Sequence, residues 1–226
     1  HNNVPTPWSI YKGIFKLPPG HFVYVREYGK SISEPQCYWD LGQIAERGSA
    51  QAHGHSGHLT DSLESLLSDA VRQRMVADVP LGAFLSGGYD SSTVAALMQS
   101  QSKRPVKTFS IGFHEEHYNE ARYAKAVAKH LGTNHTELYV TPEEAMAVIP
   151  KLPTIYDEPF SDSSQIPTFL VSQLARRHVT VSLSGDGGDE LFCGYNRYVT
   201  GYRIWQKLRF LPPMLRRTLA TICRKA

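Results

Sequence analysis

Residues 81–98 read Leu-Gly-Ala-Phe-Leu-Ser-Gly-Gly-Tyr-Asp-Ser-Ser-Thr-Val-Ala-Ala-Leu-Met. The apolar run at 81–85 predicts a buried strand, residues 86–92 form a Gly-rich turn, and residues 93–98 are typical of a helix. A strand that enters a helix through such a turn can hold phosphate, because glycines allow close approach to the backbone and the helix start supplies unpaired N–H groups. The stretch therefore predicts a phosphate-binding loop in an α/β fold.

The side chains of this turn narrow the kind of ligand. Ser86, Ser91 and Ser92 add hydroxyl donors, whereas Asp90 would repel a bare polyphosphate. The acid implies that Mg²⁺ lies between its carboxylate and the phosphates. The turn is not a Walker loop, since no Lys or Arg occurs in residues 76–102. The alternative is a surface turn in which Ser and Asp only cap a helix.

A second turn of this kind follows residues 179–183, which predict a short buried strand. It reads Ser-Gly-Asp-Gly-Gly-Asp-Glu at 184–190 and again leads into a helix start. Because ligands of an open parallel sheet gather at the carboxyl ends of its strands, both turns are expected to face one site. An acidic, solvated loop is the alternative, but it does not explain three glycines beside an apolar run.

With both turns, the chain resembles the synthetase domain of glutamine-dependent asparagine synthetases, which are ATP pyrophosphatases with a PP-loop. The first turn matches the pattern S-G-G-x-D-S-S and the second matches S-G-x-G-x-D-E. The resemblance continues at 107–113, 119–121, 130–132 and 156–160. Upstream, residues 15–21 and 38–40 resemble the closing strands of the glutaminase domain that precedes the synthetase domain in this family.

The resemblance implies an α/β fold, a parallel sheet flanked by helices, preceded by the β-rich remnant of an N-terminal-nucleophile glutaminase domain. The sequence pattern agrees, because strands predicted at 82–86, 107–112, 136–140 and 179–184 alternate with helical stretches. We expect residues 1–47 to be the C-terminal part of the glutaminase domain and residues 59–226 to be a truncated N-terminal part of the synthetase domain. Residues 48–58 are rich in Gly, Ser and His and predict a linker.

Local signals predict several helix boundaries. Asp61 and Thr141 are each followed three residues later by Glu, as in a capping box. Gly132 is expected to end a helix over 121–131. Pro212-Pro213 predicts a break between two C-terminal helices, where four leucines at helical spacing predict a core-facing stripe. These leucines are Leu208, Leu211, Leu215 and Leu219.

The resemblance also implies the role of each site residue. ATP would lie with its triphosphate over the first turn and its ribose near the start of the second turn. Its adenine would contact two apolar residues, one from each of two strands. The nucleotide-binding residues would be Ser86, Gly87, Gly88, Asp90, Ser91 and Ser92 for the triphosphate, Phe84 and Ile111 for adenine, and Ser184 and Gly185 for ribose. Asp90 and Asp189 would hold Mg²⁺. Aspartate would attack the α-phosphorus, and ammonia would then displace AMP to give asparagine.

Asp186 stands where a base is expected to take the proton that ammonia sheds. The better-known family pattern has Glu there, so the shorter Asp needs a closer approach or an intervening water. Tyr89 also departs from the pattern, which has an aliphatic residue. A β-lactam-synthetase-like enzyme would have Tyr at position 186. An amidotransferase that acts on another carboxylate, and a non-catalytic ATP-binding module, remain alternatives.

Composition bears on the partners. The chain has 226 residues, 41% of them hydrophobic, and a net charge of +3. A basic stretch at 203–226 contains no acid, but its helical leucine spacing favours a packed helix over a nucleic-acid or membrane contact. The resemblance implies that the partners are small molecules, namely ATP, aspartate and ammonia from glutamine, in a cytoplasmic enzyme. A homodimer of the full-length protein is left open.

Two kinds of site are not expected. Three cysteines without CxxC spacing predict neither a zinc site nor a disulfide framework. His53, His55 and His58 have no acid or Cys among them, so a functional metal is not expected there.

The glutaminase nucleophile of the resembled family is an N-terminal Cys, and position 1 is His. This stretch alone is therefore expected not to hydrolyse glutamine.

Overall fold

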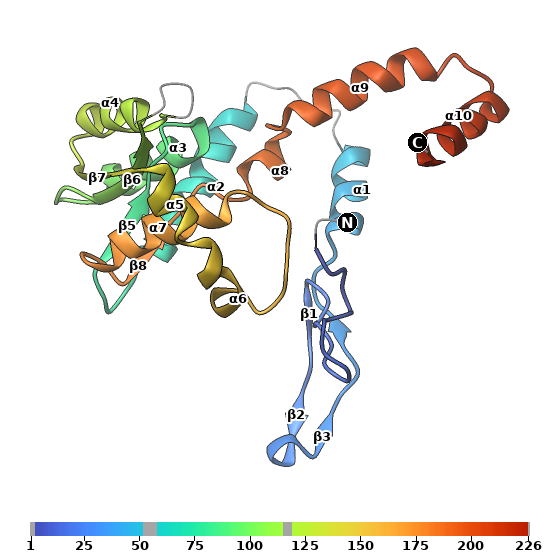
Figure 1. Cartoon of the computed structure of the whole chain (residues 1–226), viewed down its shortest axis with the longest axis horizontal. Helices are drawn as coiled ribbons and strands as arrows, with labels where there is room; N and C mark the ends of the chain where they lie inside the picture. The colour runs from blue at the N-terminus through green and yellow to red at the C-terminus, as the bar shows by residue number, and fades with distance from the viewer. Residues whose placement is uncertain (1–2, 52–57, 115–118, 226) are drawn as a thin grey trace.

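The computed structural model describes residues 3–51, 58–114 and 119–225. Its centre is a sheet of four parallel strands in the order β7-β6-β5-β8 (Figure 1). These strands are β5 (Leu81–Phe84), β6 (Lys107–Phe113), β7 (Asn134–Val140) and β8 (Val181–Leu183). The predicted α/β fold with a parallel sheet is confirmed.

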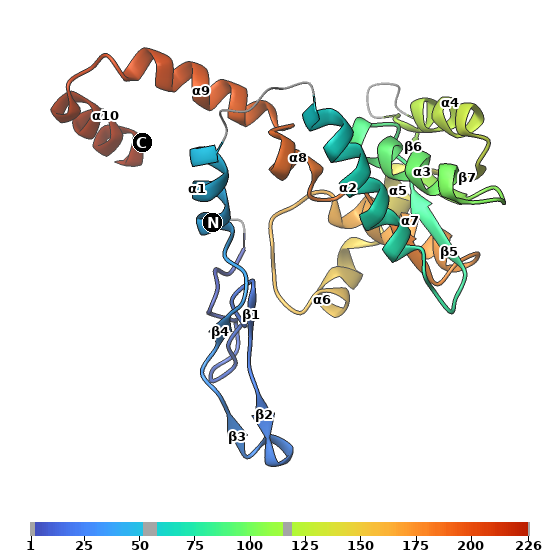
Figure 2. The same ribbon diagram turned by 180° about the vertical axis from the view of Figure 1, so that it is seen from behind.

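Helices cover both faces of the sheet (Figures 1 and 2). One face carries α2 (Leu59–Arg74), α3 (Tyr89–Gln101) and α4 (Ala121–Leu131), and the other carries α5 (Pro142–Met146) and α7 (Gln165–Arg176). Ala83 and Leu85 pack against the first group, whereas Phe109 and Val140 pack against the second. Successive side chains of a strand point to opposite faces, so the apolar runs of β5 and β6 supply both cores.

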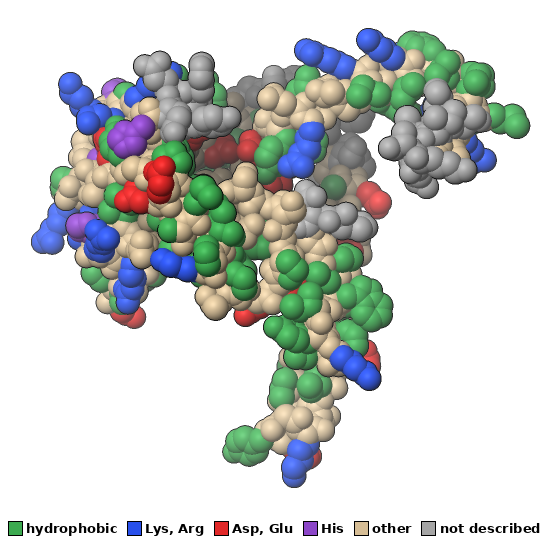
Figure 3. Space-filling model, in the orientation of Figure 1, with side chains coloured by type: hydrophobic (Ala, Val, Ile, Leu, Met, Phe, Trp, Pro, Cys, Tyr) green, Lys and Arg blue, Asp and Glu red, His purple; other side chains and the backbone are tan. Residues whose placement is uncertain are grey.

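An N-terminal arm, residues 3–40, extends away from the sheet (Figure 1). In it β1 (His21–Phe22) pairs with β4 (Gln36–Cys37), and β2 (Val25–Arg26) pairs with β3 (Ser31–Ile32), both antiparallel. The turn η1 (Glu27–Gly29) joins the inner strands. Hydrophobic side chains are exposed along the arm (Figure 3). The assignment of residues 1–47 to a glutaminase domain stays a prediction.

The predicted linker differs from the structure at its start. Helix α1 (Leu41–Gln51) continues through residues 48–51, which we expected to be linker. The Gly and Ser signal fails there because one glycine lowers helix stability by only about 1 kcal/mol. His53 and His55 lie outside the described residues, and the domain boundary itself stays a prediction.

One of the two predicted capping boxes is present. The Thr141 hydroxyl accepts the N–H of Glu144 at 3.3 Å, and the Glu144 carboxylate accepts the N–H of Thr141 at 2.9 Å. The box predicted at Asp61 is wrong, because α2 already begins at Leu59 and Asp61 lies inside its first turn. The acid is still favourable there, since it meets the positive end of the helix dipole. Gly132 ends α4 with a φ of +71°, as predicted.

The C-terminal region folds as two helices, α9 (Asn196–Leu208) and α10 (Pro213–Lys225). The predicted break at Pro212-Pro213 is confirmed. The core-facing leucine stripe is wrong at Leu215, which is 52% exposed, whereas Leu208 and Leu211 are half-buried, and both helices project away from the sheet (Figures 1 and 2). Helical spacing defines an apolar face but does not say what covers it. No helix in the described ranges is both long and apolar enough to cross a membrane.

Candidate functional site

The turns that follow β5 and β8 are in contact at the carboxyl ends of their strands. β5 and β8 are hydrogen-bonded neighbours, with Ala83 opposite Leu183. A Cβ atom added at Gly185 would lie 2.6 Å from the backbone nitrogen of Ser91, closer than real Cβ atoms come to other atoms, so this approach needs glycine. The strand order also reverses at β5, because β6 lies on its other side. Ligands of open α/β sheets bind at such a switch point.

Asp90 lies at this contact, in the first turn of α3. A Cβ atom at Gly188 would overlap the Asp90 carboxylate, so the second turn packs directly on this acid. Asp189 follows at the start of α8 (Gly188–Phe192), and its carboxylate lies against Gly194. Neither carboxylate has a hydrogen-bond or ion-pair partner among the described residues. The structure thus places the two predicted metal ligands on turns that touch, each with free oxygen atoms.

The serines of the first turn are linked to one another and to the turn backbone by hydrogen bonds. The hydroxyls of Ser86 and Ser91 lie 2.9 Å apart, and that of Ser91 also accepts the N–H of Ser86 at 3.2 Å. The Ser86 hydroxyl in turn accepts the N–H of Gly88 at 3.2 Å. These two serines therefore hold the shape of the turn. The Ser92 hydroxyl is buried and has no hydrogen-bond partner among the described residues.

The turn is supported from behind by α4. Gly87 has a φ of +85°, and a Cβ atom there would lie 2.6 Å from the backbone nitrogen of Ala124. The second position of the Gly-Gly pair, Gly88, is exposed and forms the N-cap of α3. The departure at Tyr89 is tolerated because its side chain is 95% exposed and leaves the turn unobstructed. The turn backbone is therefore fixed on one side and open on the other.

Asp186 is held by its neighbour in the second turn. The Ser184 hydroxyl donates to Oδ2 of Asp186 at 2.9 Å, and the side chain of Asp186 is exposed. Oδ1 of Asp186 has no partner in the described part of the chain. The hydroxyl predicted to meet ribose is therefore engaged with the predicted base, and it orients that carboxylate.

The two apolar residues predicted to flank adenine lie on the same face of the sheet. Phe84 ends β5 and packs in the cluster of Phe109 and Leu174, and Ile111 of β6 packs in the cluster of Val140. Both are half-buried. The structure thus puts them on neighbouring strands, on the face of the sheet that α7 covers.

A contact behind the second turn was missed by the sequence analysis. The Tyr195 hydroxyl donates to Oε1 of Glu190 at 2.7 Å, and the guanidinium of Arg197 lies 4.0 Å from the centre of the Tyr195 ring. The Tyr195 hydrogen bond holds the pKa of Glu190 below its usual range. Gly194, which makes room for Asp189, was the available sequence signal for a turn that folds back here. This contact fixes α8 and with it the position of Asp189.

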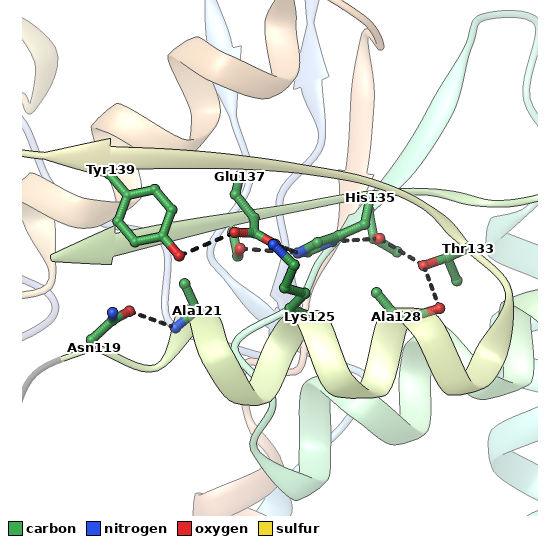
Figure 4. Close-up of polar contacts among 10 residues, drawn as sticks. Asn119, Ala121, Lys125, Ala128, Thr133, His135, Glu137 and Tyr139 are labelled. Atoms are coloured by element: carbon green, nitrogen blue, oxygen red, sulfur yellow. Dashed lines mark hydrogen bonds and ion pairs between the residues drawn. The ribbon is translucent and has the colours of Figure 1, made fainter. Parts of the chain in front are cut away.

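A second missed feature is a polar cluster between α4 and the sheet (Figure 4). The imidazole of His135 contacts the hydroxyls of Thr108 at 2.9 Å and Ser110 at 3.2 Å. Glu137 joins the strand to the helix, because its carboxylate lies 3.3 Å from the Lys125 ammonium. The side chains of His135 and Glu137 are only 9% and 14% exposed. The cluster therefore positions α4, which supports Gly87 of the first turn.

The free energy of unfolding is expected to fall as the pH drops below about 6.5, because burial holds the pKa of His135 below its ordinary value. The unfolded chain then takes up the proton more readily, at a loss of at most about 1.4 kcal/mol per pH unit. Glu137, at 3.8 Å, opposes this effect by favouring the protonated ring, whereas Lys125 supports it. The free energy of unfolding, measured with denaturant at several pH values between 7 and 5, should fall less steeply with falling pH in His135→Gln than in the wild type. Equal slopes in both proteins would contradict this assignment.

Comparisons with known proteins show the family to which the chain belongs. Residues 62–225 match the family model described as asparagine synthase. The chain is 41% identical over 195 residues to asparagine synthetase (glutamine-hydrolyzing) 1 of Bacillus subtilis, an alignment that covers 86% of this chain and 29% of that protein. It is 42% identical over 214 residues to a Methanocaldococcus jannaschii protein assigned by name to the same enzyme class, covering 94% of this chain and 40% of that protein. The chain thus spans less than half the length of these relatives.

Solved structures were also compared with the fold, and one of those that align is given as an example. The NH3-dependent NAD synthetase from Campylobacter jejuni aligns with a TM-score of 0.41 at 14% sequence identity, over 60% of each chain.

Proposed function

Because this chain belongs to the asparagine synthase family, we propose that it is the nucleotide-binding part of a ligase that converts aspartate into asparagine with ATP. The side-chain carboxylate of aspartate attacks the α-phosphorus, and pyrophosphate leaves. Ammonia then attacks the acyl carbon of the β-aspartyl-adenylate, loses a proton and displaces AMP. In the full-length protein ammonia comes from glutamine, with residues 1–47 as part of the glutaminase domain and residues 59–226 as part of the synthetase domain.

The observation that carries the proposal is the contact between the two turns. Gly185 and Gly188 bring the second turn onto Ser91 and Asp90 of the first. One edge of the sheet therefore presents backbone N–H groups and free carboxylates within a single site. A phosphate-binding turn alone would suit many nucleotide-binding proteins, whereas acids from a second turn suit a reaction at the phosphate.

Each part of the site has a distinct task in this proposal. The backbone of residues 86–92 binds the triphosphate together with Ser86, Ser91 and Ser92, and the hydrogen bond between Ser86 and Ser91 also holds the turn in shape. Phe84 and Ile111 bind adenine on the face of the sheet under α7, and Ser184 and Gly185 lie beside ribose. Since the helix start points its N–H groups at the phosphates, binding and orientation come largely from the backbone.

The residues present also fit Mg²⁺. This ion typically binds through one or two carboxylates together with substrate phosphates and water. Asp90 and Asp189 are such a pair, and their carboxylates lack protein partners among the described residues. Among the described residues, no group of three or more His, Cys, Asp or Glu side chains could hold a metal ion. The proposed site therefore uses substrate phosphates and water as further ligands. When bound, the ion would neutralise charge on the triphosphate.

Asp186 takes the proton from ammonia in this proposal. Its Oδ2 is held by Ser184, which leaves Oδ1 free to accept a proton. A positioned carboxylate of this kind typically accelerates a proton transfer by about 10²- to 10⁴-fold.

Pyrophosphate release by the full-length protein tests the proposal. With ATP, Mg²⁺ and ammonia, aspartate should support pyrophosphate and asparagine formation, whereas glutamate and other carboxylates should not. Turnover of a different carboxylate would make the protein another amide-forming ligase. ATP binding without pyrophosphate release from any carboxylate would favour a non-catalytic nucleotide-binding module and would overturn the proposal.

A further inference from the structure

Glu158 connects the N-terminal arm to the sheet region. Its Oε1 accepts the backbone N–H of Ile10 at 3.1 Å, and its Oε2 forms an ion pair with the ammonium of Lys16. The Lys16 ammonium also donates to the carbonyl of Val4 at 2.8 Å. One carboxylate thus fixes two points of the arm directly and a third through Lys16.

This ion pair is only partly shielded from solvent. The side chains of Glu158 and Lys16 are 18% and 34% exposed. The hydrogen bond from Lys16 holds the pKa of Glu158 below its usual range, so the acid stays charged at neutral pH. The pair borders an open cavity of about 490 Å³ that also contacts Asn3, Phe160 and Asp162. Partly buried pairs are screened somewhat less by salt than fully exposed ones.

The segment that carries Glu158, residues 156–164, lies between α6 (Leu152–Ile155) and α7. In both ribbon views it is the part of the sheet region that approaches the arm (Figures 1 and 2). The side chain of Gln165, the first residue of α7, donates to the carbonyls of Phe160 at 3.0 Å and Asp162 at 2.8 Å. The rings of Tyr156 and Phe160 pack edge to face with centres 4.8 Å apart. The segment is therefore tied firmly to the start of α7.

The start of α7 lies at the edge of the sheet that carries the site. Ile166 and Leu170 pack with Ile111 and Val140, which lie toward the carboxyl ends of β6 and β7. Ile111 is a predicted neighbour of adenine. A continuous set of contacts therefore runs from the arm through Glu158 and α7 to the nucleotide edge.

We propose that Glu158 is a positioning residue that docks the N-terminal arm onto the nucleotide edge of the sheet. It couples the glutaminase side of the protein to amide formation. The inference rests on the proposed function, because the arm would belong to the unit that releases ammonia from glutamine. Docking keeps that unit over the adenylate, so ammonia reaches the acyl carbon before it reaches solvent. Proximity of this kind raises the fraction of ammonia that becomes amide, without changing the chemical step of glutamine hydrolysis or of amide formation.

The test uses the full-length protein and two nitrogen sources. Glu158→Gln keeps the size and one acceptor but removes the charge, and Lys16→Met removes the ammonium. In each variant, asparagine formed per glutamine hydrolysed should fall about fivefold, a modest loss because the contact is one partly exposed ion pair. Glutamine hydrolysis and synthesis from free ammonia should stay within about twofold of the wild type. The double variant should be no worse than the single ones, because both break the same contact.

Asp157→Asn is the matched control, since this acid is adjacent, exposed and without a partner in the described residues. It should leave the ratio of asparagine to hydrolysed glutamine unchanged. An unchanged ratio in Glu158→Gln, or an equal drop in Asp157→Asn, overturns the positioning role. Failure of the proposed function looks different, because the wild type would then form no asparagine from either nitrogen source.

Discussion

Asp90→Asn in the full-length protein is expected to reduce pyrophosphate release from ATP by at least about 10²- to 10³-fold, the range for losing one key electrostatic contact to a transition state. The carboxylate is free of protein partners in the described residues and touches the second turn at Gly188. Its role is therefore charge toward Mg²⁺ and the triphosphate rather than packing. The melting temperature should change little, because the substitution breaks no hydrogen bond or ion pair.

Binding gives a readout apart from turnover. Titration of the variant with ATP should lose the Mg²⁺ dependence expected of the wild type. Near-normal pyrophosphate release by Asp90→Asn at subsaturating Mg²⁺ would show that this carboxylate does not hold the metal.

Gly188→Ala tests the same contact without removing the acid. The new Cβ atom would overlap the Asp90 carboxylate and push it from its place. Activity should fall between those of the wild type and Asp90→Asn. Gly201→Ala is a suitable control, since a Cβ atom at this position of α9 has nothing within 4 Å.

Asp186→Asn is expected to slow amide formation by about 10²- to 10⁴-fold, the range for losing a general base. Adenylate formation should suffer less, because Asp90 and Asp189 are unchanged. Pyrophosphate and asparagine should be measured in the same assay. The variant should release pyrophosphate and AMP in excess of asparagine, as the stranded adenylate hydrolyses.

Two companion variants sharpen this assignment. Asp186→Glu should restore coupling between pyrophosphate and asparagine, because it keeps the carboxylate. Ser184→Ala removes the hydrogen bond that orients Oδ2 and should lower the same ratio more mildly. If Asp186→Asn lowers both products in equal proportion, the residue serves ATP or Mg²⁺ binding and is not the base.

Local features of the fold were predictable where the signal is short-range. The strands, the capping box at Thr141 and the break at Pro212 all follow from neighbouring residues. The box at Asp61 failed because the same residues can also lie inside a first turn. The leucine stripe around Leu215 failed because burial depends on a partner surface that helical spacing does not specify.

The candidate site was predictable in its parts but not in its assembly. Both Gly-rich turns and their acids could be recognised from residue type and order. The hydrogen bond between Ser86 and Ser91 could not be predicted, because it depends on how the turn closes. The polar cluster around His135 and the contact of Glu158 with Lys16 join residues far apart in the chain, and no spacing rule connects them.

By itself, the sequence determined an alternating α/β fold and two phosphate-type turns, because strand periodicity, glycine positions and helix caps are local properties of the chain. Only the tertiary structure decided that β8 pairs with β5 on the side opposite β6, with Ala83 beside Leu183. That pairing brings together segments about one hundred residues apart. It depends on parallel hydrogen bonds and on helices that cover both faces, so the sum of long-range contacts places Asp90 against Gly188.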